Sequence, residues 1–153
     1  MSIKSFSDAI SERLKFYVYV YCDPSTGAVF YIGKGKGNRC FDHLSQNGNS
    51  EKSQRIQKIR ETDAGFEPRI DILAFGLNED QALIVEAAAI DLIGINNLTN
   101  SQKGWDSARY GRRTVDDVYA QFNGGEVDEF KDNTVLIRIN QMYDPEFNDM
   151  QLY

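Results

Sequence analysis

Residues 16–44 read FYVYVYCDPSTGAVFYIGKGKGNRCFDHL and decide the fold of this chain. The first seven residues are rich in aromatic and β-branched side chains, which favours a pleated strand. The next five, DPSTG, are turn formers, and a second strand over residues 28–32 completes a predicted β-hairpin. Side chains alternate along a strand, so Tyr17, Tyr19 and Tyr21 share one face, and Val18 and Val20 lie on the other.

The segment after the hairpin is rich in glycine and lysine. Residues 33–38 read GKGKGN, which predicts a basic turn whose backbone amides face an anion at the start of a helix. On that helix Arg39 and His43 are four residues apart, so they share one face. Tyrosine hydroxyls, Lys34, a guanidinium and an imidazole are therefore expected around one phosphate group.

These motifs resemble the GIY-YIG nuclease family. Tyr17-Val18-Tyr19 stands at the first triplet, and Tyr31-Ile32-Gly33 matches the second literally. The pattern is most similar to the branch found in LEM-domain-associated animal nucleases and their bacterial relatives. The resemblance implies an α/β fold, endonuclease activity and a site with a helical glutamate followed by an asparagine. The implied catalytic residues are Tyr19, Tyr31, Lys34, Arg39, His43, Glu86 and Asn100.

The rest of the chain completes a small α/β domain. Periodicity predicts helices over residues 2–13, 39–45, 51–62 and 79–93, and a third strand over 69–75. We expect a mixed three-stranded sheet flanked by helices. Residues 1–113 form the predicted nuclease domain, with its core at about 15–105. Residues 114–153 form a C-terminal extension of a helix and a strand at 133–140, which is interpreted as the start of a second module or a dimerisation element.

Glu86 is the predicted metal ligand. Small and apolar residues surround it in the sequence of its helix, and burying a carboxylate is costly unless a cation compensates. Mg²⁺ or Mn²⁺ would do so, since Mg²⁺ needs only one or two protein carboxylates. The alternative is a glutamate at the edge of the helix. Asn100 is the preferred partner in the following turn, and Asn97 is the second choice.

Charge and composition limit the possible partners. The net charge is −6, which excludes a uniformly basic nucleic-acid binder. Local basic segments still predict contact with a phosphate backbone. Two cysteines without CxxC spacing indicate neither a zinc site nor a disulfide framework. We expect a protein without a membrane span, intracellular and cytoplasmic, nucleoid-associated if bacterial. The predicted nucleic-acid-binding residues are Lys34, Lys36, Arg39, Lys52, Arg55 and Lys103.

The predicted reaction is metal-dependent hydrolysis of phosphodiester bonds. Glu86 would hold the metal ion, and Arg39 would neutralise phosphate charge. Tyr19 or Tyr31 would orient or deprotonate water, with Lys34 expected to depress the phenol pKa; which tyrosine is the base stays open. The family favours DNA. The alternatives are a ribonuclease and a non-catalytic binding module for nucleic acid or protein, and a homodimer is possible.

Overall fold

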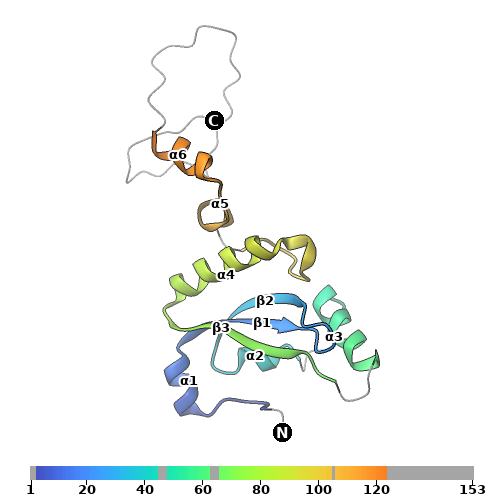
Figure 1. Ribbon diagram of the computed structural model, residues 1–153. Helices are drawn as coiled ribbons and strands as arrows, with labels where there is room; N and C mark the ends of the chain where they lie inside the picture. The colour runs from blue at the N-terminus through green and yellow to red at the C-terminus, as the bar shows by residue number, and fades with distance from the viewer. Residues whose placement is uncertain (1–2, 45–47, 63–65, 105, 124–153) are drawn as a thin grey trace.

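The computed structural model describes residues 3–44, 48–62, 66–104 and 106–123. A three-stranded sheet lies between α4 on one side and α2 and α3 on the other, and α5 and α6 extend away from it (Figure 1). The elements in chain order are α1 (Asp8–Leu14), β1 (Phe16–Cys22), β2 (Val29–Lys36), α2 (Arg39–Asp42), α3 (Glu51–Thr62), β3 (Arg69–Leu77), α4 (Glu79–Ile93), η1 (Ile95–Asn97), α5 (Ser107–Tyr110) and α6 (Val115–Asn123).

The sheet confirms the predicted α/β fold with one correction to its topology. The strand order is β2-β1-β3, and both pairings are antiparallel rather than mixed. The connection through α2 and α3 does join two strands of the same direction. These two strands are not neighbours, because the chain crosses over β1 and places β3 on its far side. An isolated bridge between Lys15 and Leu77 is the single parallel contact in the described ranges.

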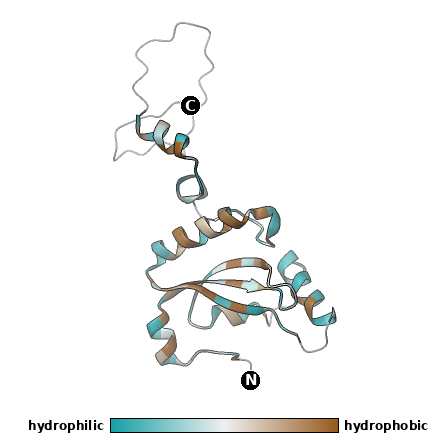
Figure 2. Cartoon of the chain, viewed as in Figure 1, coloured by the Kyte–Doolittle hydropathy of each residue, from teal (hydrophilic) through white to brown (hydrophobic). Residues whose placement is uncertain are grey.

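Strand alternation in β1 builds two cores. Tyr17, Tyr19 and Tyr21 are fully buried against α2 and α3, where Cys40 and Ile56 pack onto them. The opposite face of β1 packs against α4. The core on this side contains Val18, Val20, Cys22, Ile32, Ala82 and Ile90. Figure 2 shows brown apolar segments along the strands and on α4. The predicted division of β1 into two faces is confirmed, and both faces are covered.

The glycine-rich segment is a strand and not a phosphate-binding turn, so that prediction is wrong. β2 continues to Lys36, with Gly35 paired to Tyr17 and Gly33 paired to Tyr19. A Cβ on Gly35 would lie 2.7–2.9 Å from atoms of the Tyr17 side chain. The glycines therefore make room for phenol rings that lie across the neighbouring strand, and the turn itself follows at residues 37–38.

The helix predictions hold best where end signals are strong. α4 has the predicted bounds; Asn78 accepts from the Gln81 amide at its start, and the helix ends at Gly94. α3 also has the predicted bounds. α1 is shorter than predicted, beginning at Asp8 after Ser7 as its N-cap. The predicted strand at 133–140, and with it the predicted dimerisation element, lies outside the described residues. None of the described helices is long and apolar enough to cross a membrane.

Gly35→Ala tests the packing of phenol rings on β2. The added Cβ would meet the Tyr17 ring at less than van der Waals distance. We expect a loss of about 1–3 kcal/mol in the free energy of unfolding, typical of overpacking, measured by urea denaturation. Gly48→Ala is the control, because its Cβ would approach only Ser53 Oγ, at 3.4 Å. Equal losses in both variants would contradict this account.

Candidate active site

The outer edge of β2 is covered by groups from α4 and the loop that follows it. Thr99 donates its backbone amide and its hydroxyl to Phe30 O, at 2.7 and 3.0 Å. Asn100 accepts from Ile32 N at 3.1 Å and donates to Ile32 O at 2.7 Å. Glu86 Oε1 accepts from Lys34 N at 2.8 Å. On this edge strand, every second residue from Phe30 to Lys34 thus has its outward-facing backbone groups hydrogen-bonded. These bonds fix the position of the strand that carries Tyr31.

Glu86 is a partly buried carboxylate with one oxygen still available. Burial raises its pKa, while the hydrogen bond from the Lys34 amide and the charges of Lys34 and Arg39 oppose the rise. Oε1 is used by Lys34 N, and Oε2 has no hydrogen-bond donor in the part of the chain that the structure describes. The prediction that helix packing would bury this carboxylate is in line with its partial burial.

Tyr19 has a buried hydroxyl without a partner among the described residues. Its residue exposure is 0 %, and its ring centroid lies 6.1 Å from that of Tyr31. By contrast, Tyr17 donates to Gly37 O at 2.7 Å and Tyr21 donates to Cys40 O at 2.5 Å. Among the three β1 phenols, only the Tyr19 hydroxyl has no hydrogen-bond partner in the described residues.

The phenol pKa values move opposite to the predicted direction. Burial raises the pKa of Tyr19, and the neighbouring phenols Tyr31 and Tyr21 add to the rise while Arg39 opposes it. Burial also raises the pKa of Tyr31, followed by the negative charge of Glu86. The expected depression by Lys34 is wrong because its ammonium pairs with Glu79 Oε1 at 2.7 Å. Both phenols are therefore neutral hydrogen-bonding groups in this structure.

Cationic side chains from α2 and α3 lie around Tyr31. Arg39 is exposed at the start of α2, and its charge influences the pKa values of Tyr31 and Glu86. The imidazole of His43, just after α2, meets the Tyr31 ring edge-on at a centroid distance of 6.3 Å. Lys52 on α3 places Nζ 4.4 Å from the centroid of the same ring. The structure thus brings Tyr19, Tyr31, Arg39, His43 and Glu86 together, with Lys52 beside them.

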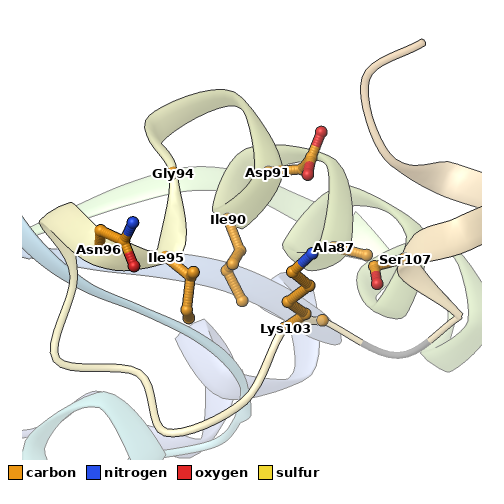
Figure 3. A pocket seen from close by; sticks show the side chains of 9 residues that line it. Ala87, Ile90, Asp91, Gly94, Ile95, Asn96, Lys103 and Ser107 are labelled. Atoms are coloured by element: carbon orange, nitrogen blue, oxygen red, sulfur yellow. The ribbon is translucent and has the colours of Figure 1, made fainter.

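The side chains of the other predicted binding residues are engaged outside this group, although the Lys34 amide bonds to Glu86. Lys34 and Lys36 place their ammonium groups over the Phe16 ring, at 5.7 and 5.3 Å. Arg55 is paired with Asp23 at 2.9 Å, beside the hairpin turn. Lys103 lines a cavity of about 210 Å³ on the flank of α4, where Figure 3 shows it near Ala87. Asn100 holds the β2 backbone, so its place in the site is structural support.

Sequence reasoning missed two residues that shape the site. Glu79 neutralises the Lys34 side chain, and Thr99 covers Phe30 O. The first could have been found, because Glu79 and Glu86 are seven residues apart and share a face of the same helix. The second could not, since no local pattern says which strand a loop residue will meet.

The fold and the site define a small α/β domain that presents a carboxylate, an arginine and two neutral phenols around one strand end. A family model described as the LEM-3-like GIY-YIG domain matches residues 23–116, more than half of the chain. The chain belongs to the LEM-3-like GIY-YIG family, which makes this a nuclease-type domain. The match includes Tyr31, Arg39 and Glu86 and begins after Tyr19. No curated protein and no solved structure matches the chain.

Tyr19→Phe removes a buried hydroxyl that has no partner in the described structure. Because an unsatisfied buried polar group costs about 1–3 kcal/mol, we expect the free energy of unfolding to stay the same or to rise by about 1 kcal/mol. Tyr17→Phe is the matched variant. It should lose about 1–2 kcal/mol, since that hydroxyl donates to Gly37 O and accepts from Cys40 N. Urea denaturation measures both, and an equal loss in the two variants would contradict the assignment.

Asn100→Ala uncovers the N–H and the C=O of Ile32 together. The expected loss is about 2–4 kcal/mol in unfolding free energy, from two broken hydrogen bonds at a partly buried strand edge. Asn97→Ala serves as its control, because that exposed amide only donates to Ile93 O at the end of α4. Thermal and urea unfolding should separate the two variants by more than 1 kcal/mol. If Asn97→Ala proves the more damaging change, Asn100 does not secure β2.

Proposed function

We propose that this domain is a metal-dependent endonuclease that hydrolyses phosphodiester bonds in DNA. The observation that carries the proposal is the partly buried Glu86 carboxylate, one oxygen of which is used by β2 while the other is available beside Tyr31 and Arg39. This arrangement occurs in a chain that belongs to a nuclease-type family. The choice of DNA rests on the family resemblance.

The residues present fit a single divalent cation held mainly by water and substrate. The described ranges contain no cluster of three or more histidine, cysteine, aspartate or glutamate side chains that could enclose a metal ion. Mg²⁺ does not require one, since it commonly binds one or two carboxylates and completes its shell with water and phosphate oxygens. Glu86 Oε2 would hold Mg²⁺ or Mn²⁺. Such a cation, when bound, supplies positive charge that polarises the scissile phosphate.

Arg39 supplies the phosphate contact from the protein. Its guanidinium is exposed at the start of α2 and carries no ion pair with the described residues. A guanidinium can donate two parallel hydrogen bonds to phosphate oxygens, which lysine cannot. In phosphodiester hydrolysis the negative charge on those oxygens changes as the reaction proceeds, so a fixed cation at this point stabilises the transition state.

The two phenols position water through hydrogen bonds. Raised pKa values keep Tyr19 and Tyr31 protonated, so they donate to and accept from a water molecule without carrying charge. The Tyr19 hydroxyl is buried and has no hydrogen-bond partner in the described structure, so a hydrogen bond to a water molecule would satisfy it. His43 lies edge-on to Tyr31, and imidazole is the side chain best suited to exchange a proton near neutral pH. We assign proton transfer to His43 and orientation of the water to the phenols.

Cleavage of supercoiled plasmid in Mg²⁺ or Mn²⁺ tests the proposal. One site cuts one strand, so nicked circles should appear before linear DNA. Glu86→Gln and Arg39→Gln should each lower the nicking rate by about 100-fold or more, the scale of losing one preorganised electrostatic group. Chelation of the cation should stop cleavage by the parent.

Glu79→Gln is the matched control for Glu86→Gln. Both carboxylates are on the same face of α4, but Glu79 is exposed and paired with Lys34, so the control should nick within about twofold of the parent, as for a weak surface ion pair. Matched DNA and RNA single strands decide the substrate. Faster cleavage of RNA would make the domain a ribonuclease, and binding without cleavage of either strand would make it a non-catalytic binding module.

A further inference from the structure

Lys52 lies on the inward face of α3. Ile56 and Ile59 are four and seven residues further along the same helix, which is the spacing of one helical face. Both isoleucines are buried against the tyrosine face of β1, at 2 % and 6 % exposure. Lys52 continues this face toward the active site and is itself partly buried. An apolar residue would be the ordinary occupant of that position.

The ammonium group of Lys52 is held against the site. Its Nζ lies 4.4 Å from the centroid of the Tyr31 ring, within the range of a cation–π contact. Arg39 is close enough that its charge, after burial, lowers the pKa of Lys52. Two cations from different helices therefore face the same region next to a phenol that the family resemblance places in the reaction.

Neither cation has a carboxylate partner in the described part of the chain. The ion pairs there join Lys34 to Glu79, Arg55 to Asp23, Arg60 to Glu67 and Arg69 to Asp71. The arginines of α3 are thus neutralised by acidic residues, whereas Lys52 is not. Placing two like charges together in a partly buried region costs free energy. A bound anion would reverse that cost.

We propose that Lys52 and Arg39 form a two-cation clamp for the phosphodiester group of the bound strand, which makes Lys52 a substrate-binding residue of the active site. This inference rests on the proposed function, because it names a residue that holds the scissile phosphate. A guanidinium such as that of Arg39 donates in its plane, and Lys52 supplies a point charge from its position over the Tyr31 ring. The aromatic ring holds the ammonium without neutralising it, so its charge remains available to the phosphate.

Binding without cleavage is the direct test. The full chain carrying Glu86→Gln is titrated, in the presence of a chelator, against a labelled single-stranded DNA oligonucleotide, and fluorescence polarisation gives the affinity. Adding Lys52→Gln should weaken binding about tenfold, the effect of one charge-assisted contact, and should reduce the slope of log affinity against log salt by about 0.7. Adding Lys52→Arg should keep the charge, with affinity within about threefold and an unchanged slope.

Lys58→Gln is the matched control. Lys58 is exposed on a different face of the same helix, and the variant loses the same net charge. We expect it to bind within about twofold of the Glu86→Gln protein, because an exposed charge distant from the phosphate is screened by salt. If Lys52→Gln and Lys58→Gln have equal affinities and salt slopes, the clamp is refuted. If Lys52→Arg binds as weakly as Lys52→Gln, charge is not the role of Lys52, and the clamp is also refuted.

The proposed clamp and the proposed nuclease activity can each be refuted without refuting the other. A parent protein that cuts no nucleic acid, combined with Lys52-dependent binding, would refute the endonuclease and support a phosphate clamp. A parent that nicks plasmid, with no effect of Lys52→Gln on affinity or on kcat/KM, would refute the clamp alone. Where both proposals hold, Lys52→Gln lowers kcat/KM for nicking at least as much as it weakens binding, and Lys52→Arg restores it.

Discussion

The site depends on the hydrogen bonds that cover the outer edge of β2. An edge strand normally leaves alternate backbone groups to solvent or to another chain. Here Thr99, Asn100 and Glu86 bond to three successive outward-facing residues. These bonds hold β2 against α4 and the loop that follows it, over the length that carries Tyr31. One of them also orients the Glu86 carboxylate, so a single arrangement fixes the strand and sets the direction of the proposed metal ligand.

The interior around this strand contains polar and ionisable groups in positions that burial disfavours. The buried hydroxyl of Tyr19 has no partner in the described residues, although Tyr17 and Tyr21 in the same row are hydrogen-bonded. Burial raises the pKa of the Glu86 carboxylate. Lys52 occupies a position on the inward face of α3 where an apolar residue is usual. Buried polar groups without a partner, and ionisable groups whose pKa values are shifted by burial, tend to occur at functional sites. All three side chains lie around Tyr31.

Sequence reasoning succeeded where a signal was local. The β-hairpin followed from alternation and turn chemistry, and both ends of α4 followed from Asn78 and Gly94. The family match confirms the family resemblance, from which the order of the candidate site residues along the chain was taken. The roles of those residues stay predictions. Reasoning failed at the GKGKGN segment, because the same glycines suit a phosphate-binding turn and a strand that passes under large rings. It failed again at Lys34, whose partner Glu79 lies far along the chain.

The sequence by itself determined most of the elements, the two faces of β1 and, through the family resemblance, the candidate site residues. It could do so because alternation, capping and motif order are properties of neighbouring residues. Only the tertiary structure decided that the sheet is antiparallel, that the phenols stay protonated, and that Asn100 supports β2. It also decided that Lys52 lies against Tyr31. Each of these outcomes depends on burial and on charges brought together from distant segments, and no local pattern encodes those distances.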